Sequence, residues 1–193
     1  MSERVSVYGE LPDGGTILTT AEYLQTAESM RVQELIYGTL QVEDSPLFRH
    51  QNLLLELAVL MRVFVGQHKL GTVCIAPQDV ILDAARALIV QPDLMFVSKA
   101  RGEIISDHIW GAPDLVVEVM SPHPRIGKLQ DRLHYFAQYG VRECWLIHQL
   151  TREIEVVNFK VFPNTAVTFR GVETIQSSVL PEFRISPELL SCW

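Results

Sequence analysis

Leu115-Val116-Val117-Glu118-Val119-Met120 is a short apolar run with a single carboxylate in its middle. Proline-containing dipeptides stand on both sides, at 113–114 and 121–122, so the run is bounded by chain breakers as a strand is. Both faces of this strand are apolar, which predicts a central strand covered by helices. Glu118 therefore loses water, and an unpaired buried charge is costly enough that a cation, a metal ion or a proton must compensate it.

A second carboxylate occupies a similar setting upstream. Asp93 lies within the run Ile89-Val90-Gln91-Pro92-Asp93-Leu94-Met95-Phe96-Val97. A third acid, Glu34, begins an earlier strand or ends the first helix. Carboxylate oxygens are the ligands that hard cations prefer, so Asp93 and Glu118 together suggest a site for a divalent metal ion.

Composition limits the class of protein and its compartment. The chain has 193 residues, of which 48% are hydrophobic and 20% are charged, as expected for one folded domain. The net charge of -7 argues against a general basic coat for nucleic acid but leaves a local basic groove open. The 3 cysteines are widely spaced, and the sequence shows neither an apolar signal core nor a membrane-spanning run. We therefore expect a cytoplasmic protein with no membrane partner.

The order of patterns along the chain predicts one continuous unit. Residues 1–18 form an N-terminal lead-in, and residues 19–193 form a single domain. Helical periodicity predicts helices over 46–67 and 124–139, and a helix start capped by Thr19. Strands are expected on both sides of Gly38, around 72–76, 79–82, 87–91, 94–97, 144–147 and 154–157, and a polar loop over 98–114. The fold class is α/β, with a mixed central sheet flanked by helices.

Two bases on the second helix complete a chemical constellation. Lys128 and Arg132 are four residues apart and share a helix face, which can fold back over the acids because a short turn joins it to the Glu118 strand. Three acids and two bases are the equipment for metal-assisted hydrolysis. A metal ion polarises a phosphoryl oxygen and lowers the pKa of its bound water, and a nearby base stabilises the developing charge.

Several short motifs in a fixed order resemble the putative restriction endonuclease domain family of the PD-(D/E)XK nuclease superfamily. They are Glu34-Leu35-Ile36-x-Gly38, Arg49-His50-Gln51, Gln91-Pro92-Asp93-Leu94, Ala112-Pro113-Asp114-Leu115-Val116-Val117-Glu118-Val119-x-Ser121-Pro122 and Gly140-Val141-x-Glu143-x-Trp145-Leu146. The resemblance spans roughly residues 19–185. It implies a restriction-endonuclease-like fold and Mg²⁺-dependent cleavage of DNA. It also implies that Asp93 and Glu118 match the metal-binding acids and Glu34 an additional upstream acid.

The chain departs from the family pattern at two places. The usual lysine, two residues after the glutamate, falls on Met120, and a lysine moved onto the following helix falls on Arg132, with Lys128 one turn away. Arginine keeps the charge but does not give up a proton. The usual acid after the Trp-Leu strand is replaced by His148.

Structural alternatives exist for each candidate residue. Glu118 could be a buried carboxylate paired with Lys128 or Arg132, and Asp93 a turn residue after proline. Glu34 could be a solvated acid at a helix end, and the two bases an ordinary exposed helix face. His50 and Gln51 begin a helix near the site and are otherwise surface polar groups.

Two functions follow from these observations. The first is a Mg²⁺-dependent DNA endonuclease, favoured because a decayed site has no physical reason to keep costly buried acids. The second is a catalytically weakened nuclease fold that acts as a binding or assembly module, favoured by the acidic balance and the missing lysine. Cutting both DNA strands with one small domain needs two active sites, so we expect a homodimer.

Overall fold

The apolar run around Glu118 is β8 (Leu115–Met120), an inner strand of a six-stranded mixed sheet of order β11-β10-β9-β8-β6-β3. The computed structural model describes residues 17–26, 29, 31–43, 45–120, 129–161 and 164–190. β8 runs antiparallel to β6 (Leu94–Ser98) and parallel to β9 (Glu143–His148). The parallel pair needs a crossover, and α3 (Leu129–Tyr139) lies within it. The outer strands are β3 (Gly71–Ile75), β10 (Glu153–Asn158) and β11 (Thr165–Arg170).

A second, five-stranded sheet has the order β2-β1-β5-β4-β7. Its strands are β1 (Gln33–Ile36), β2 (Thr39–Val42), β4 (Val80–Asp83), β5 (Leu88–Val90) and β7 (Ile109–Trp110). The chain passes from this sheet to the first at Gln91-Pro92-Asp93, between β5 and β6. Proline cannot donate to a sheet ladder, so Pro92 suits a point where one strand stops and another begins. The expected mixed α/β sheet is confirmed, and its strands divide between two sheets.

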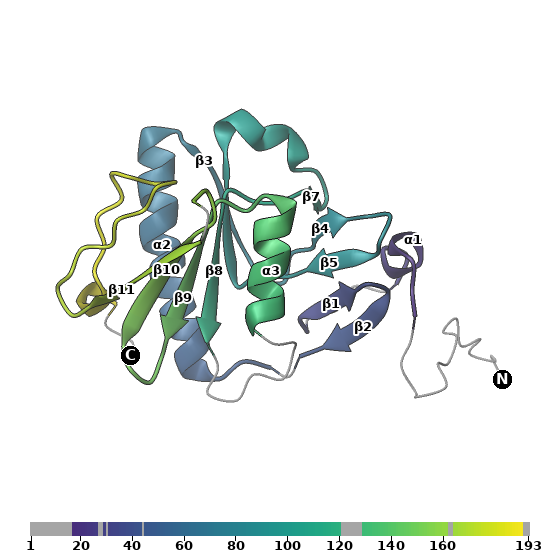
Figure 1. The fold of residues 1–193 in the computed structure, drawn as a ribbon, viewed down its shortest axis with the longest axis horizontal. Coiled ribbons are helices and arrows are strands. Elements are labelled where there is room, and N and C mark those ends of the chain that lie inside the picture. The colour runs from purple at the N-terminus through teal and green to yellow at the C-terminus, as the bar shows by residue number, and fades with distance from the viewer. Residues whose placement is uncertain are drawn as a thin grey trace.

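The helices and sheets form layers around two main apolar cores. α2 (Phe48–His68) packs on one face of the six-stranded sheet through Leu53, Leu57, Met61 and Val65. α3 and the five-stranded sheet cover the opposite face, as Figure 1 shows with α3 in front and α2 behind. β8 contributes to both cores, Val117 and Val119 to the first and Val116 to the second. Its apolar character on both faces follows from this double coverage.

Short elements complete the described chain. α1 (Thr20–Tyr23) begins at Thr19, whose side chain forms the expected capping box with Glu22. The segment expected as a polar loop holds a 3₁₀ turn, η1 (Lys99–Ile104), and β7. A second 3₁₀ turn is η2 (Pro187–Leu189). Residues 1–16 of the expected lead-in and the first part of the expected helix 124–139 lie outside the described residues. No helix in the described ranges is both long enough and apolar enough to span a bilayer.

A buried carboxylate attaches the C-terminal segment to the sheet. Glu143, at the start of β9, is fully buried and accepts a hydrogen bond from the indole N–H of Trp145 at 2.8 Å. It also accepts from the hydroxyls of Ser177 and Ser178 at 2.6 and 2.7 Å and from the backbone N–H of Ser178 at 2.7 Å. Four donors replace the water that this carboxylate has lost.

A second buried carboxylate joins the strand ends farthest from Glu118. Asp114, immediately before β8, accepts the backbone N–H of Ser98 at 2.8 Å and a guanidinium hydrogen bond from Arg142 at 3.0 Å. Arg101 lies 3.6 Å from the same carboxylate. The end of β6, the start of β8 and the approach to β9 are thereby held together.

Candidate active site

The guanidinium of Arg132 bridges the buried carboxylate of Glu34 and the largely buried one of Glu118, which come from different sheets. Its Nε donates to Oε1 of Glu118 at 2.7 Å, and its Nη1 donates to both carboxylate oxygens of Glu34 at 2.7 Å. Glu118 comes from β8, Glu34 from β1 and Arg132 from the first turns of α3. The site therefore lies where α3 meets both sheets. Glu34 lies within a strand and is fully buried, so its interpretation as a solvated helix-end acid is wrong.

Asp93 is held beside Glu118 by the backbone of β8. Its Oδ2 accepts the N–H of Val119, the residue after Glu118, at 2.7 Å. Its Oδ1 lies 3.1 Å from Nε2 of His50, in the first turn of α2. The side chains of Asp93 and Glu118 remain 17% and 13% exposed, so solvent reaches both. The two acids expected to act together are thus adjacent, on the side of β8 where the strand ends.

The site carries more negative than positive charge. Burial raises the pKa of Glu118 to about 8; the charge of Arg132 lowers it in part, and the charges of Asp93 and Glu34 raise it further. Burial acts to lower the pKa of Arg132, but Glu118 and Glu34 outweigh burial and hold that pKa well above its usual range. One guanidinium does not offset all three acids: a proton compensates Glu118 below about pH 8, and a bound cation would take the place of that proton.

Glu43, which no motif identified, and His50, expected near the site, are electrostatically linked to the acids. Burial raises the pKa of Glu43, the negative charge of Glu34 raises it further, and Arg132 lowers it in part. Burial lowers the pKa of His50, but the hydrogen bond to Asp93 and the charges of Asp93 and Glu43 outweigh burial, so the pKa is raised. Glu43 follows β2 in a polar segment, and no local pattern distinguishes it from a surface acid.

Hydrogen bonds made by Gln91 hold the carboxylate of Glu34 in place. The backbone N–H of Gln91 donates to Oε1 of Glu34 at 2.7 Å. The side chain of Gln91 accepts the N–H of Gln33 at 3.1 Å and donates to Asp79 at 2.8 Å. Asp79 in turn accepts the hydroxyl of Tyr23 at 2.9 Å. Gln91 therefore ties Glu34 to the body of the five-stranded sheet.

The structure also describes most of the other residues that the sequence singled out. Lys128 lies outside the described residues. Met120 ends β8 and supplies no charge where the usual lysine falls. His148 lies 3.5 Å from Glu155 on the neighbouring strand β10, and Gln51 is exposed. The expectation that a base on the helix points at Glu118 is confirmed for Arg132.

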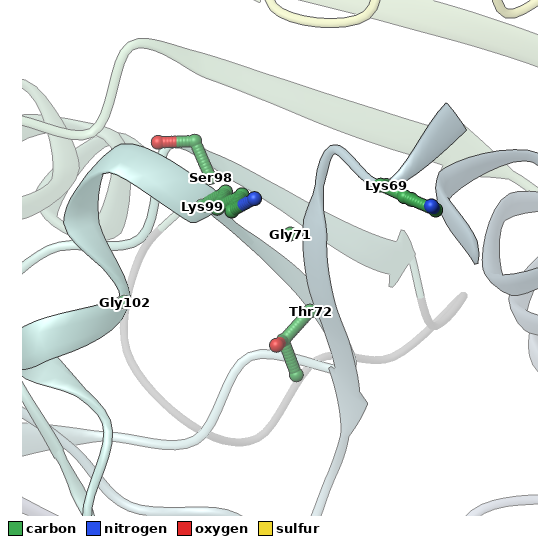
Figure 2. Close-up of a pocket in the computed structure, with 6 residues that line it drawn as sticks. All are labelled: Lys69, Gly71, Thr72, Ser98, Lys99 and Gly102. Carbon is green, nitrogen blue, oxygen red and sulfur yellow. The ribbon is translucent and has the colours of Figure 1, made fainter. Parts of the chain in front are cut away.

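A surface hollow lies at the other end of the sheet. It encloses about 320 Å³ and is lined by Lys69, Gly71, Thr72, Ser98, Lys99 and Gly102. Figure 2 shows Lys69 and Lys99 on either side of Gly71. Gly71 pairs with Ser98, at the end of β6, and Asp93 immediately precedes the start of that strand. The hollow is therefore separate from the carboxylates.

The donor chemistry of the site suits a hard divalent cation. Asp93 and Glu118 offer carboxylate oxygens, the ligand type of Mg²⁺ and Mn²⁺. Within the described ranges, no three or more side chains of His, Cys, Asp or Glu form a ready ligand cluster. One carboxylate oxygen of Glu118 accepts a hydrogen bond from Arg132, so the arginine supplies the positive charge beside this acid.

Comparisons with known proteins agree with this fold. The family model Uma2, described as "Putative restriction endonuclease", matches residues 20–188. A crystal structure of a putative nuclease belonging to DUF820 from Anabaena variabilis ATCC 29413 has a TM-score of 0.75 at 18% sequence identity. The alignment covers 91% of this chain and 98% of that one. No curated protein matches the chain.

Proposed function

Because the chain belongs to the Uma2 family of putative restriction endonucleases, we propose that it is a Mg²⁺-dependent endonuclease that hydrolyses phosphodiester bonds in DNA. The observation that carries the proposal is the convergence of Glu34 and Glu118 on Arg132, with Asp93 hydrogen-bonded to the backbone next to Glu118. Buried acids in excess of their cation are costly unless something else binds them. Phosphodiester hydrolysis needs such a cation and a stabiliser of developing negative charge.

The residues divide the chemistry between them. Asp93 and Glu118 would hold Mg²⁺, or Mn²⁺ in its place, which supplies an activated water and polarises the phosphoryl oxygen. His50 and the N–H of Val119 orient Asp93, and Gln91 orients Glu34. Arg132 stays protonated throughout, so it stabilises charge and does not act as a base.

A second function is favoured by the same arginine. Arg132 already compensates Glu118 and Glu34, and the usual lysine position holds Met120. A chain that uses its arginine to neutralise the acids could keep the fold as a binding or assembly module without cutting DNA. The two functions differ in their response to divalent metal, because a metal that binds only the native state raises its stability by mass action.

Thermal unfolding with and without Mg²⁺ or Mn²⁺, followed by a DNA cleavage assay, tests the proposal. The endonuclease predicts a higher melting temperature and metal-dependent cleavage, both lost in Asp93→Asn. Asp107→Asn, which alters an exposed aspartate, should retain both. Unchanged melting and no cleavage by the parent protein would leave the binding module as the better account. A metal response that survives Asp93→Asn would place the ion elsewhere.

We propose in addition that the chain forms a homodimer in the cytoplasm. α2 is apolar on two sides, and Leu55, Val59 and Val63 form an exposed row at four-residue spacing on its outer face. Exposed apolar side chains gathered on one helix face commonly mark a protein–protein interface. Near the C-terminus, Leu190 is buried in the core, whereas Leu189 is 59% exposed.

A further inference from the structure

An exposed arginine lies in a cluster of tyrosines next to the acidic site. The guanidinium carbon of Arg86, in the turn between β4 and β5, lies 4.6 Å from the ring centroid of Tyr37. Its Nη1 lies 3.4 Å from the hydroxyl of Tyr139 on α3. The ring of Tyr135 meets that of Tyr37 edge-on at 5.6 Å. The cluster thus spans the five-stranded sheet and α3, the helix that carries Arg132.

Contacts with tyrosines hold the guanidinium of Arg86 in place, but no carboxylate of the described residues pairs with it. Asp83, at the start of the same turn, accepts the hydroxyl of Tyr139 at 3.0 Å and the backbone N–H of Arg86 at 3.0 Å. Across the part of the chain that the structure describes, the guanidinium forms no ion pair with a carboxylate. Stacking on an aromatic ring orders an arginine while leaving its N–H donors available for an anion.

The turn that holds Tyr37 is locally unfavourable for a tyrosine. Tyr37 and Gly38 link β1 to β2 with φ angles of 49° and 87°. A two-residue hairpin turn with both φ values positive prefers Asn, Asp or Gly at its first position. A bulky residue there carries strain, which the surroundings must sustain. The N–H of Gly38 donates to the carbonyl of Ala87 at 3.0 Å, so this turn and the turn of Arg86 are fastened together.

The tyrosine cluster and Arg132 are separated along α3 by a distance that a few nucleotides can span. Residues 132 and 139 are seven positions apart, which corresponds to about 10 Å of helix rise. That is about three base steps of a duplex at roughly 3.4 Å of rise each. A DNA duplex whose axis follows α3 and that has one phosphate at the carboxylates would therefore place others near the tyrosines. An acidic site on a chain of net charge -7 needs a nearby cation to hold such a polyanion.

We propose that Arg86, held by Tyr37 and Tyr139, binds a backbone phosphate of the DNA strand that occupies the candidate active site. The proposal rests on the proposed endonuclease function. It assigns positioning of the substrate to the five-stranded sheet, whereas Asp93, Glu118 and Arg132 perform the chemistry. Phosphate contacts of this kind set register and affinity and do not read sequence.

Binding of a short fluorescent DNA duplex in Ca²⁺, titrated at several salt concentrations, tests the proposal. Arg86→Ala should weaken binding about tenfold, the scale of one charge-assisted contact. The slope of log K against log salt should become less negative by about 0.9, the value for one phosphate contact. In Mg²⁺, the same variant should raise KM and leave kcat nearly unchanged.

Matched variants separate this role from general effects. Arg184→Ala removes the same charge from an exposed position in the C-terminal segment, on the far side of the molecule from β1 and β2 (Figure 1), and should bind as the parent does. Tyr37→Phe keeps the ring and should also match the parent, whereas Tyr37→Ala should weaken binding. If Arg86→Ala melts well below the parent, Arg86→Gln provides the same test with a side chain that can still contact Tyr139.

The outcomes distinguish the two proposals. A parent protein that neither binds nor cuts DNA overturns the endonuclease function and this inference with it. A parent that binds and cuts, with an Arg86→Ala variant of equal affinity and salt slope, overturns the inference alone. An equal loss in Arg184→Ala also overturns it, because the effect would then be one of net charge.

Discussion

Arg132 is the residue on which the acidic site depends, since it compensates Glu34 and Glu118 at once. Arg132→Ala should leave two buried carboxylates without their cation and lower the free energy of unfolding by about 3–5 kcal/mol. It should also slow DNA cleavage by about 10²-fold, the scale of one preorganised electrostatic contact. Urea unfolding and cleavage rates measure both.

Lys128→Ala is the matched control for this prediction, because the sequence places Lys128 on the same helix face as Arg132. It should leave the cleavage rate nearly unchanged. Equal losses in the two variants would mean that the bases share the role. No loss in either would remove the helix from the mechanism.

Asp114 provides a residue-level prediction about pH. Burial acts to raise its pKa, but hydrogen bonds from Ser98 and Arg142 and the charge of Arg101 outweigh burial, so the pKa lies below the usual 3.8. Its contribution to stability is therefore present above pH 3.8 and is lost as the pH falls through the lowered pKa.

Asp114→Asn should accordingly cost about 2–3 kcal/mol of unfolding free energy near neutral pH. The difference from the parent should shrink as the pH falls below 3.8. Denaturant unfolding across an acid series measures it, with Asp107→Asn as the exposed control. A difference that stays constant with pH would show that the carboxylate charge is not what stabilises.

At the scale of elements, the local sequence pattern is enough to predict a helix or strand when other elements cover it on two sides. β8 and α2 were predicted close to their observed bounds because their apolar spacing reflects the layers that cover them. The edge strand β11 was missed because its side chains are mostly exposed and leave no burial pattern. The division into two sheets was also missed, since pairing of β1 with β5 joins Leu35 to the distant Ile89.

The candidate site shows the same limit. Its acids stand out because a carboxylate in an apolar strand is unusual at any one position. Their partners do not: Arg132 and Glu34 are 98 positions apart, and Glu43 and Gln91 look like ordinary polar residues. Only the packing of α3 against both sheets brings them together.

The pairing of β3 with β6 depends on the absence of a side chain at Gly71. A Cβ at this position would lie 2.1 Å from the carbonyl oxygen of Val97 and 2.9 Å from the backbone N of Lys99. Backbone atoms cannot move aside cheaply, so Gly71→Ala should cost about 2–3 kcal/mol of stability. Gly102→Ala should be near neutral, because nothing lies within 4 Å of its Cβ. Thermal melts compare the two, and a stable Gly71→Ala would mean that the strands separate easily here.

For the whole molecule, the apolar outer face of α2 predicts a dimer, which a measurement of molecular mass in solution can test. Light scattering at micromolar concentration should give twice the mass of the chain. Val59→Glu, in the middle of the row of Leu55, Val59 and Val63, should give a monomer that stays folded, because Val59 is 53% exposed. Thr165→Glu, at an exposed position of the edge strand β11, is the control. A monomeric parent would leave this face without a partner.

The ion pair between Glu34 and Arg132 also constrains the order in which the nascent chain acquires its structure. β1 is synthesised long before α3, yet it carries the acid whose cation comes 98 positions later. Burying Glu34 without that cation is strongly unfavourable. β1 therefore cannot pack stably in the protein before α3 has left the ribosome. Contacts of such separation also form slowly. The candidate site is thus completed only after α3 has been synthesised, and a chain that ends before α3 lacks it.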